Sequence, residues 1–284
     1  MQRIATDSGE NGFPTIDPVR RRLYGIGDKV IDIDSNRPVA ALHNSEHGFV
    51  LAPDLGRGLG MDGTLFDLAT LKTVAKVDAD AFTSAYDSAT GRAFLFRWQV
   101  WVVDMRTGKL VGMVDLAADP QSAVSDGAGR IYVNLGARDS MAVIDANTLR
   151  VVARWPLRPC HSAGGLSIDR VHHRLFASCQ RMLAVVDADN GRVVATVPIA
   201  HGAISNAFDP TTNLIFNPNG SGSDSTISVI HEDTPDTYRI VERVPTGPRV
   251  SRLATVDPQS HRIYVIGMPD DRDQVLVFEP TTGH

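Results

Sequence analysis

The chain has 284 residues, of which 43% are hydrophobic and 21% are charged, and its formal net charge at pH 7 is −5. These values are typical of a globular protein, and a mildly acidic chain without a basic stripe argues against nucleic acid as the main partner. No apolar run approaches the roughly 20 residues of a membrane-spanning helix, and residues 1–12 lack the apolar core of a signal peptide.

One four-stranded unit recurs along the whole chain, and residues 166–199 show it most completely. In this stretch four short runs rich in Val, Leu and Ile alternate with turns rich in Asp, Asn and Gly, which is the pattern of antiparallel strands. Every copy places an aspartate at the end of its first strand. These anchor aspartates are Asp17, Asp54, Asp87, Asp126, Asp169, Asp209 and Asp257. They lie 33 to 48 residues apart, which is the spacing of β-propeller blades.

Taken in chain order, the strands after each anchor repeat as well. The predicted second strands begin at residues 22–24, 92–94, 130–132, 174–176, 214–216 and 262–264. The predicted third strands include residues 102–104, 143–145, 185–187 and 275–277. The second copy is degenerate at residues 56–60, but residues 65–68 restore its third strand.

The two ends of the chain predict how the ring closes. The last copy stops after its third strand, and Arg-Ile-Ala-Thr at residues 3–6 is similar to the fourth strand at 193–196. The residues after the last anchor and those up to the first add up to 44, which is one normal period. The N-terminal strand should therefore complete the last blade and leave no open edge. The predicted fold is an all-β, seven-bladed propeller of four-stranded antiparallel blades, formed by residues 1–284 as a single domain.

These repeats resemble the YVTN-type β-propeller family, whose repeats are also described as 40-residue or surface-layer-like. The matching motifs are Asp-Pro turns at 17–18, 209–210 and 257–258, aromatic-led strands at 132–134 and 264–266, and a turn at 104–108. The resemblance covers essentially the whole chain and implies the propeller fold. Because members of this family are often exported, it implies a mature periplasmic or secreted protein, with the cytoplasm as the alternative. It implies no activity, since propellers host many unrelated functions.

The two cysteines are predicted to lie on one face of the propeller. Cys160 lies in the loop that enters the fifth blade, and Cys179 lies between the second and third strands of that blade. A disulfide between them is geometrically plausible and would favour an oxidising compartment. Two unpaired cysteines fit the spacing equally well.

A ring of ionisable side chains is predicted at the mouth of the central channel. The position seven or eight residues before the anchor is ionisable in all seven copies. This ring consists of Glu10, His47, Asp80, Asp119, His161, His201 and Arg249. Three imidazoles suit Zn, Cu, Fe or Ni, and an open fourth position is typical of a catalytic site. We therefore expect His47, His161 and His201 to hold a divalent transition metal, although His47 must reach across the channel.

The other members of the ring have predicted catalytic and binding roles. Asp80, Asp119 and Glu10 are candidate general bases or additional ligands. Arg249, with Arg252 and Trp98 nearby, is the candidate site for an anionic substrate group. This pattern favours a metal-dependent hydrolase or lyase, a monomer acting on a small anionic molecule. A water-filled mouth with mutually compensating charges is the structural alternative.

Two further functions stay open from the sequence. One is a propeller that binds a metal or a small molecule without turnover. The other is a protein-interaction scaffold that uses outer loops such as residues 217–226, predicted to be mobile, and 270–273. No Gly-rich phosphate loop and no Cys-x-x-Cys-His motif is present, so neither a nucleotide nor haem c is expected. His172, His173 and His261 are predicted to be solvated turn residues.

Overall fold

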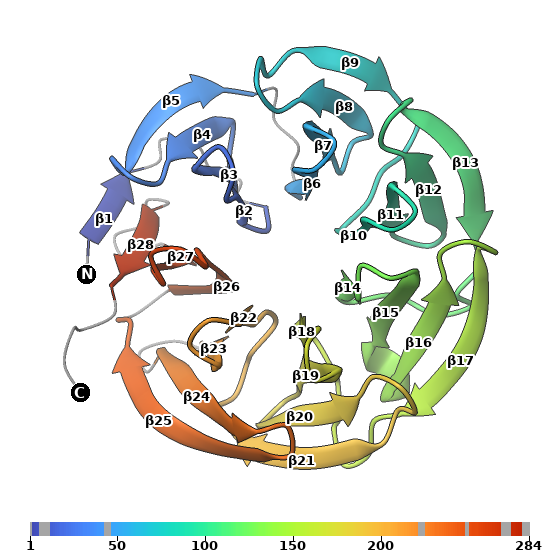
Figure 1. Cartoon of the computed structure of the whole chain (residues 1–284). Helices are drawn as coiled ribbons and strands as arrows, with labels where there is room; N and C mark the ends of the chain where they lie inside the picture. Colours follow the sequence, from blue (N-terminus) through green and yellow to red (C-terminus); the bar gives the residue numbers. More distant parts are fainter. Residues whose placement is uncertain are drawn as a thin grey trace.

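The computed structural model describes residues 2–5, 12–42, 47–220, 225–247, 250–267 and 274–279. Seven four-stranded antiparallel sheets stand around a central channel, as Figure 1 shows. This arrangement confirms the predicted seven-bladed propeller. Over the described ranges the only helical segment is the 3₁₀ turn η1 (Gly136–Arg138), and no helix there is long and apolar enough to cross a membrane.

The first four blades follow one another directly in the sequence. Blade 1 contains β2 (Thr15–Asp17), β3 (Arg22–Ile26), β4 (Lys29–Asp32) and β5 (Arg37–Ala41). Blade 2 contains β6 (Phe49–Ala52), β7 (Arg57–Gly60), β8 (Thr64–Asp67) and β9 (Thr73–Lys76). Blade 3 contains β10 (Thr83–Asp87), β11 (Arg92–Phe96), β12 (Val100–Asp104) and β13 (Lys109–Val114). Blade 4 contains β14 (Ala123–Ser125), β15 (Arg130–Leu135), β16 (Ser140–Asp145) and β17 (Arg150–Pro156).

The last three blades complete the ring, and the seventh takes its outer strand from the N-terminus. Blade 5 contains β18 (Leu166–Asp169), β19 (Arg174–Ser178), β20 (Met182–Asp187) and β21 (Val193–Pro198). Blade 6 contains β22 (Ala207–Asp209), β23 (Leu214–Asn219), β24 (Thr226–Thr234) and β25 (Thr237–Pro245). Blade 7 contains β26 (Val250–Val256), β27 (Ile263–Gly267), β28 (Gln274–Phe278) and β1 (Gln2–Ala5).

Ring closure follows the predicted route. Strand β1 pairs antiparallel with β28 and places Ile4 opposite Val275. Ile4 is buried and belongs to an apolar cluster that includes Leu23 of blade 1 and Val277 of blade 7. The N-terminal strand therefore covers the edge of β28 and also adds an apolar side chain to the boundary between the last blade and the first.

The antiparallel order gives the propeller two different faces. We call the first the loop face, because it carries the loops that enter each blade and those between second and third strands, such as residues 157–165 and 136–139. The opposite turn face carries the short turns that follow the first and third strands. The predicted mobile loop 217–226 is only partly a loop, since Asn217 and Asn219 belong to β23 and are buried. Within it, residues 221–224 lie outside the described ranges, as do 270–273.

The anchor aspartates cap the turns as predicted, and they also join neighbouring blades. Asp87 accepts a hydrogen bond from the backbone N–H of Thr90 within its own turn. Its other oxygen accepts from the Ser125 hydroxyl of blade 4 at 2.9 Å. At the boundary of blades 6 and 7, His261 Nδ1 lies 2.6 Å from Asp209 Oδ2. His261 is therefore a bridge between blades and not a solvated turn residue, because the buried carboxylate draws the imidazole inward.

A second set of hydrogen bonds joins neighbouring blades in the same way at four boundaries. Side chains that lead the second strand donate to the carbonyl just after the third strand of the following blade. The pairs are Arg22 with Leu68, Arg92 with Ala146, Tyr132 with Ala188, and Tyr264 with Ile33. The Arg and Tyr residues of the repeat therefore have a structural role, which is to satisfy carbonyls that would otherwise be unpaired at blade boundaries.

Replacing Ile4 with Ala should lower the free energy of unfolding by about 2–4 kcal/mol, because it removes a buried side chain from the closing strand. Urea unfolding followed by circular dichroism measures this loss. Val19→Ala is the matched control, since Val19 is 69% exposed and its truncation should change the stability by no more than about 0.5 kcal/mol. Equal midpoints for Ile4→Ala and the unsubstituted chain would show that β1 does not close the ring.

Tyr132→Phe should cost about 1 kcal/mol of stability, because it removes the 3.1 Å hydrogen bond to the Ala188 carbonyl across the blade boundary. Tyr24 occupies the same position of the repeat and is fully buried, but its hydroxyl finds no acceptor within the described residues. Tyr24→Phe should therefore be neutral or slightly stabilising in the same urea experiment. A loss of equal size in both variants would contradict the assignment of the bond.

Candidate interaction surface

The cavity on the propeller axis is small, and the described residues that line it are uncharged. A cavity of about 140 Å³ lies on the axis, whereas ligand pockets usually have volumes of roughly 300–1,000 Å³. Its lining comes from all seven blades: Phe13, Thr15, Phe49, Met61, Thr83, Ser84, Ser122, Ala123, Leu166, Ser205, Asn206 and Ala254. This cavity is therefore too small to hold a substrate of drug-like size, and its described lining offers no charged partner for an anionic group.

The side chains that face this cavity lie mostly two to five residues before the anchor aspartates. The predicted ring lies seven or eight residues before them in the sequence, and none of its five described members lines the cavity. Asp80, Asp119, His161 and His201 are exposed, and His47 is partly buried. Only residues in the short first strand, or directly before it, lie along the axis. The residues further back in the entering loop lie on the loop face.

The ring does not bring its three histidines together. Among the described residues, the one group of His, Cys, Asp or Glu side chains close enough to share a metal contains none of His47, His161 and His201. Glu10 and Arg249 lie outside the described ranges, and the side chain of Arg252 is not described either.

A compact group of aromatic and charged side chains does form on the loop face, at the boundary of blades 2 and 3. We call it the Phe82–Trp98 cluster; its members are His47, Asp80, Phe82, Arg97 and Trp98. The Arg97 guanidinium lies 4.4 Å from the centre of the Phe82 ring and 4.6 Å from that of Trp98. The His47 ring meets Phe82 edge-on at 4.8 Å, and Asp80 forms an ion pair with Arg97.

This cluster is rigid, and yet its largest ring is open to solvent. Trp98 is 72% exposed and Phe82 is 41% exposed, whereas the Arg97 side chain is only 19% exposed. The backbone holds the rings in place, because Phe82 N donates to Phe96 O at 2.9 Å and Arg97 N donates to Gln99 O at 3.0 Å. Trp and Arg are among the residue types enriched at the energetic centres of protein interfaces.

Three predicted site residues therefore meet here, in a different role from the predicted one. His47, Asp80 and Trp98 surround an aromatic platform instead of a metal or a substrate. Phe82 and Arg97 were missed by the sequence analysis. Two features of the sequence pointed to them. Phe82 is an aromatic residue two positions after Asp80, and Arg97 stands next to Trp98 in a turn between strands. Neither feature shows which side chain from another loop will be in contact.

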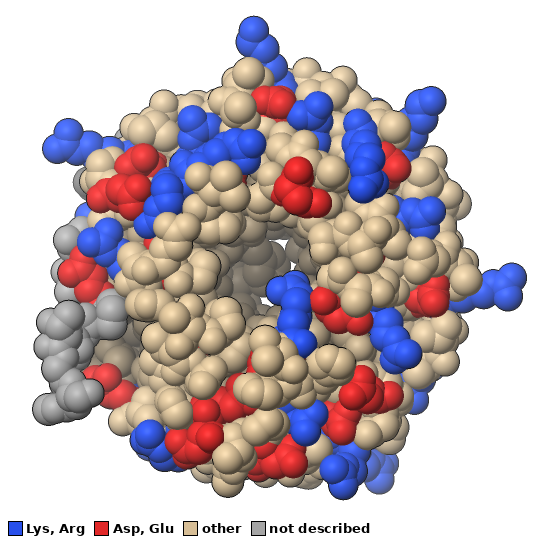
Figure 2. Space-filling model, in the orientation of Figure 1, with Lys and Arg blue, Asp and Glu red and all other residues tan. Residues whose placement is uncertain are grey.

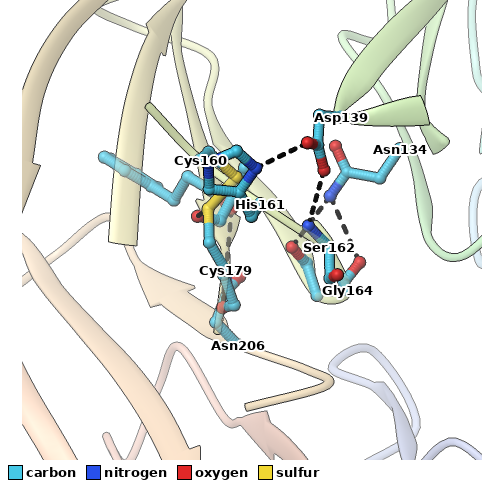
Figure 3. Close-up of a disulfide and its surroundings, with 12 residues drawn as sticks. Asn134, Asp139, Cys160, His161, Ser162, Gly164, Cys179 and Asn206 are labelled. Atoms are coloured by element: carbon cyan, nitrogen blue, oxygen red, sulfur yellow. Dashed lines mark hydrogen bonds and ion pairs between the residues drawn. A yellow bond between two sulfur atoms is a disulfide. The ribbon is translucent and has the colours of Figure 1, made fainter. Parts of the chain in front are cut away.

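A second group on the loop face joins blades 4 and 5, and Figure 3 shows it. His161 Nδ1 lies 2.6 Å from Asp139 Oδ2, and the Ser162 backbone N–H donates to Asp139 Oδ1 at 2.9 Å. The Ser162 N–H and the neighbouring His161 hold the pKa of Asp139 below its ordinary value. The predicted metal ligand His161 is thus engaged with a carboxylate from the preceding blade.

The two cysteines form a disulfide directly beside this pair (Figure 3). Cys160 and Cys179 are both buried. The bond ties the loop that enters blade 5 to the loop between β19 and β20. It therefore fixes the part of the loop face that carries His161 and Ser162.

On one face of the propeller, the charged side chains do not form a continuous field of one sign. On the face in Figure 2, Lys and Arg side chains are interspersed with Asp and Glu around a central hollow. Such a surface gives little long-range steering of a charged partner.

Comparisons with known proteins place the chain among β-propellers. It aligns with U3-55K at a TM-score of 0.79 and 10% identity, over 98% of each chain. The WD40 repeats of RRP9 align at a TM-score of 0.78 and 10% identity, over 98% of this chain and 97% of that one. A chain of a mitotic checkpoint complex aligns at 0.76 and 11% identity, over 98% and 91%. No family model and no curated protein matches the sequence. At this identity the likenesses show the fold.

The predicted metal-dependent hydrolase or lyase with a small anionic substrate is wrong. One of the similar structures is titled as the WD40 repeats of RRP9, and another as a mitotic checkpoint complex. The described histidines of the ring do not converge, and the axial cavity is small and its described lining is uncharged. The physical reason is that equivalent positions in the repeat lie on a wide circle of loops, so that ligands from distant blades stay apart.

Mutating both cysteines to Ala should destabilise the chain by about 3 kcal/mol, because the disulfide closes a loop of 19 residues and restricts the unfolded state. Urea unfolding with and without a reducing agent measures the effect. A reductant that can reach the bond in the unfolded chain should lower the midpoint of the unsubstituted protein and leave the Cys160→Ala/Cys179→Ala variant unchanged. If the reducing agent changes the urea midpoint of neither protein, the result would contradict the Cys160–Cys179 disulfide.

Proposed function

We propose that this protein is a protein-interaction platform and that its loop face binds the partner. The single observation that carries the proposal is the Phe82–Trp98 cluster, in which an aromatic ring that is 72% exposed rests on a clamped guanidinium. The similar structures support it, since one is titled as a mitotic checkpoint complex. A propeller offers its loops as a broad rigid surface, which suits the binding of another protein.

The physical advantage of the cluster is that its side chains are already held in place before a partner binds. Arg97 is held by Asp80 and by two rings, so its rotamer freedom is already lost in the free protein. Burying Trp98 then costs little additional ordering. Aromatic anchors of this kind typically contribute about 2 kcal/mol or more when a partner covers them, which corresponds to roughly a 30-fold change in affinity.

We also infer that the chain works in an oxidising compartment, outside the cytoplasm, and that its repeats are of the YVTN type. The Cys160–Cys179 disulfide supports the first inference, because such bonds persist in secreted and periplasmic proteins. The Asp-Pro turns and the aromatic-led second strands support the second.

The test is affinity capture of partners with the immobilised full chain, beside the double variant Phe82→Ala/Trp98→Ala. We expect at least one protein to be retained by the unsubstituted chain and depleted about 30-fold by the double variant. Quantitative mass spectrometry of the eluted proteins measures the depletion.

The matched control is Val171→Ala, since Val171 is 77% exposed and lies on the turn face. This variant should retain the same proteins as the unsubstituted chain. Thermal melting confirms that all the chains are folded. A retained set that is identical for the double variant and the unsubstituted chain would refute the assignment of the binding surface.

A further inference from the structure

Several blade boundaries bury the carboxylate of an anchor aspartate and stabilise it in the same way. Each has a buried anchor carboxylate, and the neighbouring blade supplies a hydrogen-bond donor to it. The Ser125 hydroxyl donates to Asp87 Oδ1, and the Arg21 guanidinium donates to Asp257 Oδ1 at 2.8 Å. A buried carboxylate is tolerated only when such donors compensate for the lost water.

The boundary between blades 5 and 6 departs from this pattern. The anchor there is Asp169, which is 2% exposed, and blade 6 presents Glu232 of β24, which is also 2% exposed. The neighbouring blade thus adds a second carboxylate where the other boundaries have a donor. His172, in the turn after Asp169, lies between the two, with Nδ1 2.6 Å from Asp169 Oδ2 and 3.6 Å from Glu232 Oε1.

The group is short of positive charge and of donors. Glu232 Oε1 accepts from the Tyr238 hydroxyl at 3.2 Å, but Oε2 meets no donor in the described part of the chain. One imidazole cannot neutralise two buried carboxylates, so a further cation at this place would lower the energy of the fold.

We propose that Asp169, His172 and Glu232 form a binding site for a divalent transition-metal ion that joins blade 5 to blade 6. One ligand atom from each side chain lies within 4.8 Å of the others, a separation that small side-chain movements can adapt to a shared ion. One imidazole nitrogen with two carboxylate oxygens suits Zn²⁺ and its first-row neighbours, whereas Mg²⁺ and Ca²⁺ prefer oxygen alone. The His172 side chain is 39% exposed, which leaves a path for the ion to enter.

This site lies on the turn face and is independent of the partner-binding role of the Phe82–Trp98 cluster. Its function would be structural. The ion takes the place of the hydrogen-bond donor that Ser125 or Arg21 supplies to the buried carboxylate at other boundaries. Loss of the ion should therefore weaken the fold near β18 and β24 without changing the loop face.

The test is calorimetric titration of Zn²⁺ into the chelator-treated, untagged full chain, beside Glu232→Gln and His172→Gln. We expect about one Zn²⁺ ion per chain, with an affinity weakened about tenfold or more in each variant. Titration with Co²⁺ should give a visible absorption band that reports nitrogen and oxygen ligation, and this band should be lost in His172→Gln. Zn²⁺ should also raise the melting temperature of the unsubstituted chain but not of Glu232→Gln.

The matched control is His261→Ala, because His261 has the same 2.6 Å pairing with an anchor aspartate but belongs to no such trio within the described residues. Its Zn²⁺ affinity should equal that of the unsubstituted chain. The proposal is overturned if no saturable binding occurs, which would mean that a proton shared between the carboxylates is sufficient. It is equally overturned if Glu232→Gln and His172→Gln bind as tightly as the unsubstituted chain, which would place the ion elsewhere. Circular dichroism establishes that each variant is folded, and either variant alone decides the outcome.

Discussion

The fold depends on how carboxylates are buried between blades. The anchor aspartate caps its own turn in six of the seven blades, Asp54 being the exception among the described residues. Several of these aspartates also accept a hydrogen bond from the next blade. Asp87 with Ser125 and Asp209 with His261 show the arrangement at two boundaries. Because a buried carboxylate without a donor costs several kcal/mol, each such pair makes the position of one blade depend on the next. The hydrogen bonds of Arg92 and Tyr132 add to this coupling.

The two faces of the propeller have different roles: the turn face carries contacts that stabilise the fold, and the loop face carries the proposed binding surface. The turn face holds the anchor aspartates and their partners, most of them buried and mutually satisfied. The loop face holds longer connections, and these carry the exposed Trp98 and the disulfide of Cys160 with Cys179. A change on the turn face should therefore act through unfolding, whereas a change in the Phe82–Trp98 cluster should act on binding alone. The proposed metal site belongs to the first kind, since it replaces a donor between blades.

The error about the ionisable ring has a definite origin. Positions that are equivalent in a repeat must lie on a circle, and the sequence analysis assumed that this circle was the channel mouth. The side chains on the axis are in fact about four residues further along, where Thr83 and Ser122 face the cavity. His161 instead pairs with Asp139 of the preceding blade, and His47 packs on Phe82. Asp80, Asp119, His161 and His201 are exposed, and at such positions a charged side chain costs little.

The sequence by itself determined the number of blades, the four strands of each and the closure by residues 2–5, because these follow from a repeat period and from local turn chemistry. It also identified Asp169 and its equivalents as turn caps. Only the tertiary structure decided which side chains meet. The Cys160–Cys179 bond, the contact of Arg97 with Phe82 and Trp98, and the meeting of His172 with Glu232 all join segments from different turns or blades. Such contacts depend on the rotation between successive blades and on the path of each loop. Neither feature produces a repeating pattern in the sequence from which it could be predicted.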